Sequence, residues 1–244
     1  MAFKLSFFRK LSCLIPTGRG FICAMLAAAI PLVTALGAEK AAKSSQCAAL
    51  AKLAGPSFVV EKAEIVPAGP APAADGSGAA DSLGAPLPEH CLVQGMLNPR
   101  TGADGRKFGL GFDLRMPTKW NGRFAFQGGG GLDGRLAPAL GDIFGSVRPP
   151  ALARGFAVVG TDGGHRGSWL DGSFGLDQQA RIDYAYNALD KVTLKAKELV
   201  EKYYGAAPKV LIFIGVLEWG TPRVDGFSAF ATLFRWHRCR RSFY

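Results

Sequence analysis

Residues 123–134 read R-F-A-F-Q-G-G-G-G-L-D-G, and the interpretation of the whole chain depends on this stretch. Phe124, Ala125 and Phe126 form a short apolar run that is typical of a strand buried on both faces. The four glycines that follow cannot fill a core, but they expose backbone N–H groups and allow close approach. A phosphate cradle, an oxyanion hole and a plain surface turn are all compatible with such a loop.

The composition indicates a globular protein that does not bind nucleic acid. The chain has 244 residues, 48% of them hydrophobic, which is enough for one large domain or part of one. The formal net charge is +10, but residues 1–38 supply four of these charges and residues 216–244 supply three. Only +3 is left for the middle of the chain, where no basic stripe with interleaved aromatic residues occurs. Nucleic acid is therefore excluded as a partner.

The amino terminus has the layout of a secretory signal peptide. Basic residues up to Arg19 precede the apolar run of residues 21–36, and the small residues Gly37 and Ala38 follow it. We therefore predict a signal peptide over residues 1–38, a secreted or periplasmic protein, and no membrane association after cleavage. A retained anchor is the alternative, although the run is short for a membrane span and Pro31 interrupts it.

Export also decides how the cysteines are interpreted. Cleavage would leave Cys47, Cys91 and Cys239 in the mature chain. In an oxidising compartment we predict a disulfide between Cys47 and Cys91, which would close a loop containing the low-complexity residues 67–88. Two unpaired, half-buried thiols are the alternative.

A β-hairpin is predicted directly after Cys91. Residues 91–96 have the composition of a strand, residues 98–106 are rich in turn-forming residues, and residues 108–116 alternate with a period of two. Pro117 is expected to end the second strand.

The remainder of the chain alternates buried strands with helix. Residues 155–161 and 209–215 are short apolar strands, and residues 151–154 are interpreted as the end of a helix. Apolar residues recur at helical spacing over residues 178–204, with Asp177 placed as the N-cap and Gly205 as the residue after the helix. We therefore predict an α/β fold with a mostly parallel sheet, helices on its faces and an antiparallel hairpin leading in.

Asp162 and His165 are candidate pocket residues. They belong to the sequence D-G-G-H, which follows the strand of residues 155–161 at its carboxyl end, where open α/β sheets bind ligands. A tight turn would also select Asp162 beside Gly163, and a single His in a loop is more often structural than catalytic. His165 is therefore a candidate for lining a pocket and not for a general base.

Five segments, in this order, closely resemble the amino-terminal half of the tannase and feruloyl esterase family. They are C-L-V-Q-G, G-F-D-L-R-M-P-x-x-W-N-G-R-F, Q-G-G-G-G-L-D-G, A-x-x-x-G-F-A-V-V-G-T-D-G-G-H and K-x-L-V-E-K-Y-Y-G. The resemblance runs from about residue 47 to residue 215. It implies a secreted α/β-hydrolase that uses a Ser-His-Asp mechanism on small-molecule phenolic esters, such as esters of ferulate or gallate, without a cofactor.

In this family a backbone N–H of the glycine loop donates a hydrogen bond to the oxyanion of the reaction intermediate. The resemblance makes Gly129 and Gly130 the candidate oxyanion-hole donors, with a second donor expected from the residue after the nucleophilic Ser. No metal ligand is predicted in this chain, and a family calcium site, if one exists, would lie in the lid domain.

The sequence departs from the family after Gly215. The family continues with the nucleophile elbow G-C-S-x-G-G, whereas residues 216–222 read V-L-E-W-G-T-P. Codons for these residues, read one base later, permit C-S-N-G-G-R, and residues 234–239 read in the same way permit F-D-G-I-V-A. We therefore predict a one-base frame change between about residues 209 and 216.

This hypothesis divides the chain into three parts. Residues 1–38 are the signal peptide, residues 39–215 are the amino-terminal part of the hydrolase domain, and residues 216–244 are an out-of-frame tail. The nucleophilic Ser, the triad Asp and His and the lid domain would all be missing, and the chain would be inactive. The alternative is a secreted, non-catalytic binder of phenolic ligands that uses the same glycine loop and the edge formed by residues 162–165.

Overall fold

The structure, a computed structural model, describes residues 30–70, 85–142, 149–168 and 170–215. Most of the predicted signal peptide, most of the low-complexity loop and the whole predicted tail lie outside the described residues. The chain separates into two compact units, Met1–Ala38 and Glu39–Tyr244, and the description below concerns the second. Signal cleavage and the frame change stay predictions.

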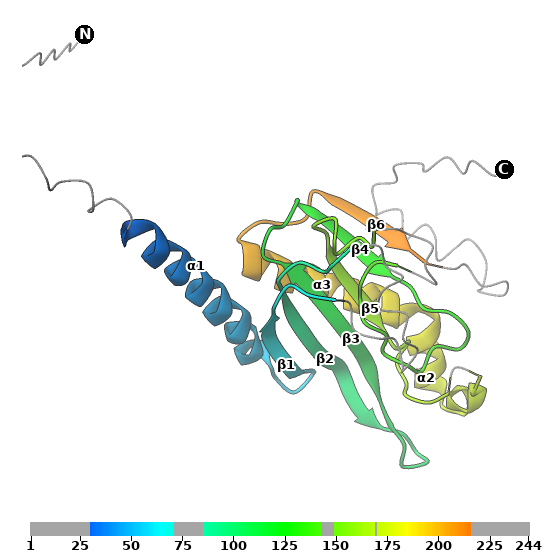
Figure 1. The fold of residues 1–244 in the computed structure, drawn as a ribbon. Helices are drawn as coiled ribbons and strands as arrows, with labels where there is room; N and C mark the ends of the chain where they lie inside the picture. Colours follow the sequence, from blue (N-terminus) through cyan, green and yellow to red (C-terminus); the bar gives the residue numbers. More distant parts are fainter. Residues whose placement is uncertain (1–29, 71–84, 143–148, 169, 216–244) are drawn as a thin grey trace, which may run out of the picture. The chain divides into compact units, whose positions relative to one another are not determined.

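A six-stranded mixed sheet is the centre of the fold, with the strand order β1-β2-β3-β5-β4-β6 (Figure 1). The strands are β1 (Phe58–Val66), β2 (His90–Thr101), β3 (Lys107–Pro117), β4 (Arg123–Gln127), β5 (Ala157–Thr161) and β6 (Val210–Ile214). Three pairings are antiparallel, β1 with β2, β2 with β3 and β3 with β5, whereas β4 is parallel to both β5 and β6. The predicted mostly parallel sheet is therefore wrong for the described strands, because β1 was not foreseen and the hairpin pairs on both of its sides.

The predicted hairpin is confirmed, but its strands are longer and more buried than expected. Strand β2 continues to Thr101, so the turn shrinks to residues 102–106, and a register shift between Leu97 and Arg100 accommodates the irregular segment. Strand β3 is buried at every position after Lys107. The predicted alternation of buried and exposed residues fails because both faces of β3 are covered in the folded protein.

The apolar runs predicted as strands form β4, β5 and β6, which lie side by side in the sheet. Phe124, Ala125 and Phe126 are at most 2% exposed, as expected of a strand buried on both faces. Residues 151–154 form a turn and not the end of a helix. The physical reason is that Pro150 disfavours helical backbone in the residue before it and neither Pro149 nor Pro150 has an N–H to donate, so no helix runs into residues 151–154.

One helical segment follows, as predicted over residues 178–204, but it contains an unforeseen π turn. It consists of α2 (Gln178–Ile182), the π turn η4 (Asp183–Asn187) and α3 (Ala188–Tyr204). The Asp177 carboxylate accepts a hydrogen bond of 2.8 Å from the Ala180 N–H, which confirms the N-cap. Gly205 adopts φ +72°, the left-handed conformation that ends many helices.

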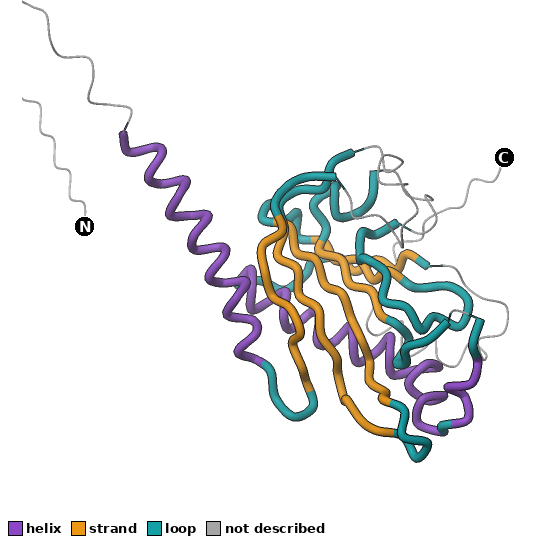
Figure 2. Tube along the Cα trace, turned by 60° about the horizontal axis from the view of Figure 1, so that its bottom comes forward, coloured by secondary structure: helices purple, strands orange, loops and turns teal. Residues whose placement is uncertain are grey.

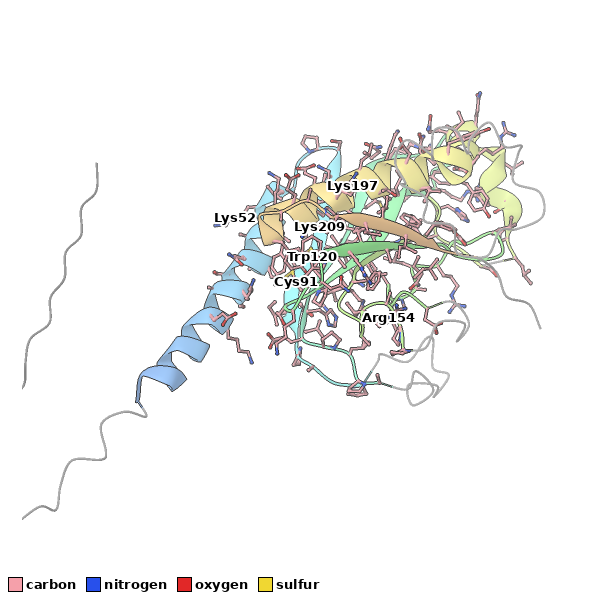
Figure 3. All side chains as sticks on the ribbon, turned by 90° about the horizontal axis from the view of Figure 1, so that it is seen from above. Lys52, Cys91, Trp120, Arg154, Lys197 and Lys209 are labelled. Carbon is pink, nitrogen blue, oxygen red and sulfur yellow. A yellow bond between two sulfur atoms is a disulfide. The ribbon has the colours of Figure 1, made fainter. Side chains whose placement is uncertain are left out.

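Helix α3 covers one face of the sheet (Figures 1 and 2). Its buried residues include Val192, Leu199 and Val200, which join Phe112 and Phe126 in the main hydrophobic core. Each such side chain contributes about 1.5–3 kcal/mol when fully buried. At the end of α3, Tyr204 stacks on Trp120 with a ring-centroid distance of 4.2 Å (Figure 3).

The amino-terminal helix α1 (Ile30–Ala49) and the short 3₁₀ helix η1 (Leu50–Leu53) were not predicted. Cys47 of α1 is fully buried and forms a disulfide with Cys91 at the start of β2, which confirms the predicted pair (Figure 3). The hydrophobic core includes both cysteines. None of the helices in the described ranges is long and apolar enough to cross a membrane.

Removing the disulfide should destabilise the protein by about 4 kcal/mol, because the bond closes a loop with a sequence separation of 44 residues. The test is urea unfolding of Cys47→Ala/Cys91→Ala against the wild type, with and without dithiothreitol. The reductant should destabilise the wild type by a similar amount and leave the double variant unchanged. A loss below about 1 kcal/mol in the double variant would contradict this expectation.

Candidate functional site

The glycine loop lies at the carboxyl edge of the sheet, beside the end of β6. Strands β4 and β6 are parallel and in register, with Gln127 opposite Ile214. The Gly128 N–H donates a hydrogen bond of 2.8 Å to the Ile214 carbonyl oxygen. Residues 128–131 are therefore held next to Gly215, where the strand β6 has just ended.

Gly129 and Gly130 present N–H groups that no described residue accepts. Gly129 is exposed and Gly130 is half-buried. A Cβ added to Gly129 would lie 2.1 Å from Oδ1 of Asp133, so a larger residue here requires the Asp133 carboxylate to move. The role of Gly129 and Gly130 in an oxyanion hole stays a prediction.

Tyr184 holds this loop from the helical side. Its hydroxyl donates a hydrogen bond of 2.8 Å to the carbonyl oxygen of Gly131. Its ring packs where a side chain on Gly163 would be, 2.9 Å from the position of a Cβ there. Sequence reasoning missed this contact, because residues 131 and 184 approach each other only in the folded chain.

The π turn that carries Tyr184 is braced by Asp183. Oδ1 of this buried side chain accepts hydrogen bonds from Nε2 of Gln179 (2.9 Å) and from Nδ2 of Asn187 (2.8 Å). A Cβ on Gly164 would lie only 3.0 Å from that of Asp183, so the glycine allows the π turn to approach. Such insertions in helices occur frequently at functional sites.

Asp162 is fully buried and organises the turn after β5. Its Oδ1 accepts hydrogen bonds of 2.9 Å from the N–H groups of Gly111 and Gly164. Its Oδ2 has no hydrogen bond to a described residue and lies 3.9 Å from Nε of Arg166. Burial raises the pKa of this carboxyl group to about 6, although the two backbone hydrogen bonds stabilise the charged form and act in the opposite direction. The structure therefore gives Asp162 the role of a turn residue, and its role in a pocket stays a prediction.

His165 lines a cavity of about 180 Å³. The imidazole is 3% exposed, stacks on Phe174 with a centroid distance of 3.7 Å, and makes no hydrogen bond of normal geometry to the described residues. Burial lowers the pKa of His165, although the backbone of Gly163 and Leu132 acts in the opposite direction. The ring is therefore neutral at physiological pH. Asp162 does not line this cavity.

Ser173 and Asp171 line the same cavity as His165, but the three do not form a catalytic triad. The Ser173 hydroxyl donates to Oδ2 of Asp171 (3.0 Å) and accepts from Arg106 (2.9 Å). A triad needs the base to contact the nucleophile, and the described structure shows no hydrogen bond between His165 and Ser173. The cavity can bind a ligand, but it has no activated nucleophile.

A buried polar network anchors the segment that follows the glycine loop. Asp113 accepts hydrogen bonds from Arg115 (2.8 Å), Gln94 (2.7 Å) and the Ala139 N–H (3.0 Å). Sequence reasoning did not single it out, although Asp113 and Arg115 are two residues apart on a strand and therefore share a face. Two charged residues on a strand that is otherwise apolar are the feature of the sequence that could have indicated this buried network.

Gln127, the last residue of β4, anchors the same segment. Its side-chain amide donates to the Pro138 carbonyl oxygen (3.1 Å) and accepts from the Gly141 N–H (2.7 Å). The glycine loop is thus bounded by anchored backbone on its carboxyl-terminal side. Among the described residues, no group of three or more His, Cys, Asp or Glu side chains is arranged to hold a metal ion.

A mixed sheet with a helical layer, and a glycine loop at the carboxyl edge that follows the parallel strand β4, is the arrangement of an α/β-hydrolase-like domain. Comparison with known proteins agrees. The sequence profile of the family described as "Tannase and feruloyl esterase" matches residues 91–224, which is more than half of the chain. The chain belongs to the tannase and feruloyl esterase family.

Individual relatives are consistent with this assignment. The chain is 45% identical over 148 residues to a mono(2-hydroxyethyl) terephthalate hydrolase from Piscinibacter sakaiensis, an alignment that covers 58% of this chain and 24% of that protein. It is 33% identical over 192 residues to an uncharacterized esterase from Xanthomonas campestris, covering 77% of this chain and 30% of the relative.

Among solved structures, the crystal structure of feruloyl esterase B from Aspergillus oryzae is similar, with a TM-score of 0.52 and 26% identity. The match covers 71% of this chain and 32% of the fungal enzyme. The chain therefore spans about a quarter to a third of the length of the relatives that it matches.

Replacing Tyr184 by Phe should loosen the glycine loop, because it removes the hydrogen bond to Gly131, worth about 0.5–1.5 kcal/mol. We expect the ¹⁵N order parameters of residues 129–131 to fall from about 0.85 toward 0.6. Tyr186→Phe is the matched control, since Tyr186 lies on the same π turn with its side chain largely exposed. Unchanged order parameters in Tyr184→Phe would show that this bond does not position the loop.

Asp162 should make the stability of the protein depend on pH. Its pKa is about 6 in the folded state and 3.8 in the unfolded state, so the folded state binds the proton more tightly. Wild-type stability therefore falls as pH rises from about 4 to 6, by at most about 3 kcal/mol. In Asp162→Asn this titration is absent, whereas the Asn oxygen can still accept both backbone hydrogen bonds.

The measurement is the difference in unfolding free energy between the two proteins at pH 4 and pH 7.5, which should shift in favour of Asp162→Asn at the higher pH. Burial lowers the pKa of His90 and of His165, which gives the opposite slope, but these titrations are common to both proteins and cancel in the difference. Asp104→Asn is the control, because hydrogen bonds from Arg106 lower the pKa of Asp104. A difference that does not change with pH would rule out the buried carboxyl as its source.

Proposed function

We propose that this chain is the amino-terminal portion of a carboxylic ester hydrolase domain that acts on phenolic-acid esters. The observation that supports the proposal most directly is the pair of accessible N–H groups on Gly129 and Gly130, held beside the end of β6 by the hydrogen bond from Gly128 to Ile214. In α/β-hydrolases one oxyanion donor comes from such a loop and the nucleophile follows the neighbouring strand.

Gly129 or Gly130 would stabilise the oxyanion of the tetrahedral intermediate. One donor of this kind contributes about 10²–10³ to kcat when it is aimed at the developing charge. The second donor would come from the residue after a Ser nucleophile, with a His as general base and an Asp that fixes the His tautomer. No cofactor is needed for this chemistry.

Residues 1–244 as written would not complete this site. The segment that follows Gly215 reads V-L-E-W-G-T-P and has no Ser on a Gly-flanked elbow. We assign residues 39–215 to the amino-terminal part of a hydrolase domain, and residues 216–244 to an out-of-frame tail. Loss of the nucleophile alone lowers kcat by on the order of a millionfold. The family profile extends to residue 224, into this tail, so the coding DNA is the deciding test of the frame hypothesis.

The proposal includes secretion. Residues 1–38 would be removed as a signal peptide, and the mature protein would be secreted or periplasmic, where the disulfide between Cys47 and Cys91 can form. Its substrate would be a small-molecule phenolic ester. A non-catalytic binder that holds a phenolic ligand at the glycine loop would use the same surface without turnover.

An ester-hydrolysis assay tests the activity directly. We expect no turnover of methyl ferulate, methyl gallate or mono(2-hydroxyethyl) terephthalate by the purified chain above a heat-denatured sample. The Piscinibacter sakaiensis hydrolase serves as the positive control for the last substrate. Turnover by the native chain that disappears on denaturation would contradict the proposed inactivity.

A second experiment tests the hydrolase assignment itself. Deleting one base between codons 209 and 216 of the gene, expressed together with the DNA downstream of codon 244, should restore the elbow and the frame of the segments that follow it and give an ester hydrolase. Activity of this restored protein should fall sharply in Gly129→Ala, because the added methyl group collides with Asp133, whereas Gly55→Ala meets nothing within 4 Å. A folded restored protein that cleaves no ester would overturn the assignment and favour the binder.

A further inference from the structure

The cavity beside His165 is separate from the glycine loop. It measures about 180 Å³ and lies between the start of β3 and the segment of residues 165–174. Its lining residues are Arg106, Lys107, Phe108, His165, Arg166, Asp171, Ser173 and Phe174. None of residues 128–131 lines it, and the hydrolase mechanism proposed above does not use it.

The inner wall of the cavity is aromatic and rigid. Phe108, His165 and Phe174 are each at most 7% exposed, and the His165 and Phe174 rings are stacked. An apolar cavity of about 150 Å³ holds one benzene molecule. A cavity of about 180 Å³ therefore has room for a single ring with a small substituent.

Three cations and one carboxylate line the rim of the cavity, and the cation of Arg106 is also paired with Asp104. Arg106, Lys107 and Arg166 line it together with one carboxylate, Asp171, both of whose oxygens bind Ser173. Arg106 and Ser173 are fixed to each other by bonds from the guanidinium group to Oγ and to the carbonyl oxygen, both 2.9 Å. This arrangement preorganises the rim around the cavity.

Two of these cations, Lys107 and Arg166, have exposed side chains. The Lys107 ammonium group donates to the Thr101 hydroxyl (2.7 Å) and has no carboxylate partner among the described residues. Arg166 has a 55% exposed side chain and lies 3.4 Å from a Glu61 oxygen and 3.9 Å from the buried Asp162. Both side chains are long, exposed and able to turn toward an anion at the mouth of the cavity.

We propose that this cavity binds a single-ring aromatic carboxylate, with the ring against Phe174 and His165 and the carboxylate at Lys107 and Arg166. Lysine and arginine side chains form charge-assisted hydrogen bonds with carboxylates. The aromatic wall offers no partner to a small hydrated anion, so such an anion does not enter the interior of the cavity. Cleavage of a phenolic ester releases an acid of this class, so the biological role of the site rests on the proposed function. Binding of the acid does not depend on that function.

The test is a titration of the purified chain with 4-hydroxybenzoate and with gallate, followed by ¹H–¹⁵N shifts of residues 165–174. Both acids should give saturable shifts, and 4-hydroxybenzamide, which lacks the charge, should bind about tenfold more weakly. Inorganic phosphate distinguishes a general anion site from an aromatic-acid site, and it should not compete at equal concentration. Binding of the amide or of phosphate as tight as that of the acids would overturn the proposal.

The variant Lys107→Gln/Arg166→Gln should weaken binding of the acids about tenfold, since it removes both exposed cations. The matched control is Lys52→Gln/Arg154→Gln, which removes the same charge at two exposed residues that do not line the cavity (Figure 3). All four positions are exposed, so melting temperatures should stay close to that of the wild type. Unchanged affinity in the first variant, or an equal loss in the second, would refute the site.

The proposal for the cavity and the proposal of a hydrolase can be contradicted independently of each other. Saturable acid binding by a chain whose frame-restored form cleaves no ester would keep the cavity and remove its link to ester cleavage. Ester cleavage by the restored protein without acid binding at residues 165–174 would remove the cavity and keep the hydrolase. A tenfold change in affinity corresponds to about 1.4 kcal/mol, well within the resolution of such titrations.

Discussion

The parallel pairing of β4 with β6 is the constraint on which the candidate site depends. Strand β4 is buried on both faces between β5 and β6, so it cannot shift register without moving Phe124 and Phe126 out of the core. The hydrogen bond from Gly128 to Ile214 extends this pairing by one residue. The first exposed backbone of the loop therefore emerges at a defined point beside the end of β6.

Buried and partly buried polar side chains hold the rest of the loop. Tyr184 reaches Gly131 from a π turn that Asp183 braces, and Asp113 and Gln127 fix the backbone downstream. Buried polar groups cost free energy unless their hydrogen bonds are made, and these four groups all make them. The distances and angles of these hydrogen bonds therefore restrict the positions of the polar side chains more strongly than packing restricts apolar side chains, which tolerate repacking. A loop supported in this way can keep amides aimed without reorganising.

The glycine loop and the cavity beside His165 are two chemically different surfaces of the same chain. The glycine loop offers neutral backbone donors at the sheet edge, while the cavity beside His165 offers an aromatic wall and long cationic side chains. Tyr184 lies between these regions, in contact with the loop through Gly131 and in edge contact with His165. Both regions lie within residues 91–224, which match the profile of the tannase and feruloyl esterase family.

By itself, the sequence determined the features that depend on near neighbours. The apolar runs of β4, β5 and β6, the Asp177 cap, the Gly205 helix end and the pairing of the two described cysteines all follow from local composition or compartment. Only the tertiary structure decided that the sheet is mixed, that β1 completes it, and which polar groups reach the glycine loop. The physical reason is range: propensity and periodicity act over a few residues, whereas burial and hydrogen bonding join residues as distant as 131 and 184, which become neighbours only when the core has formed.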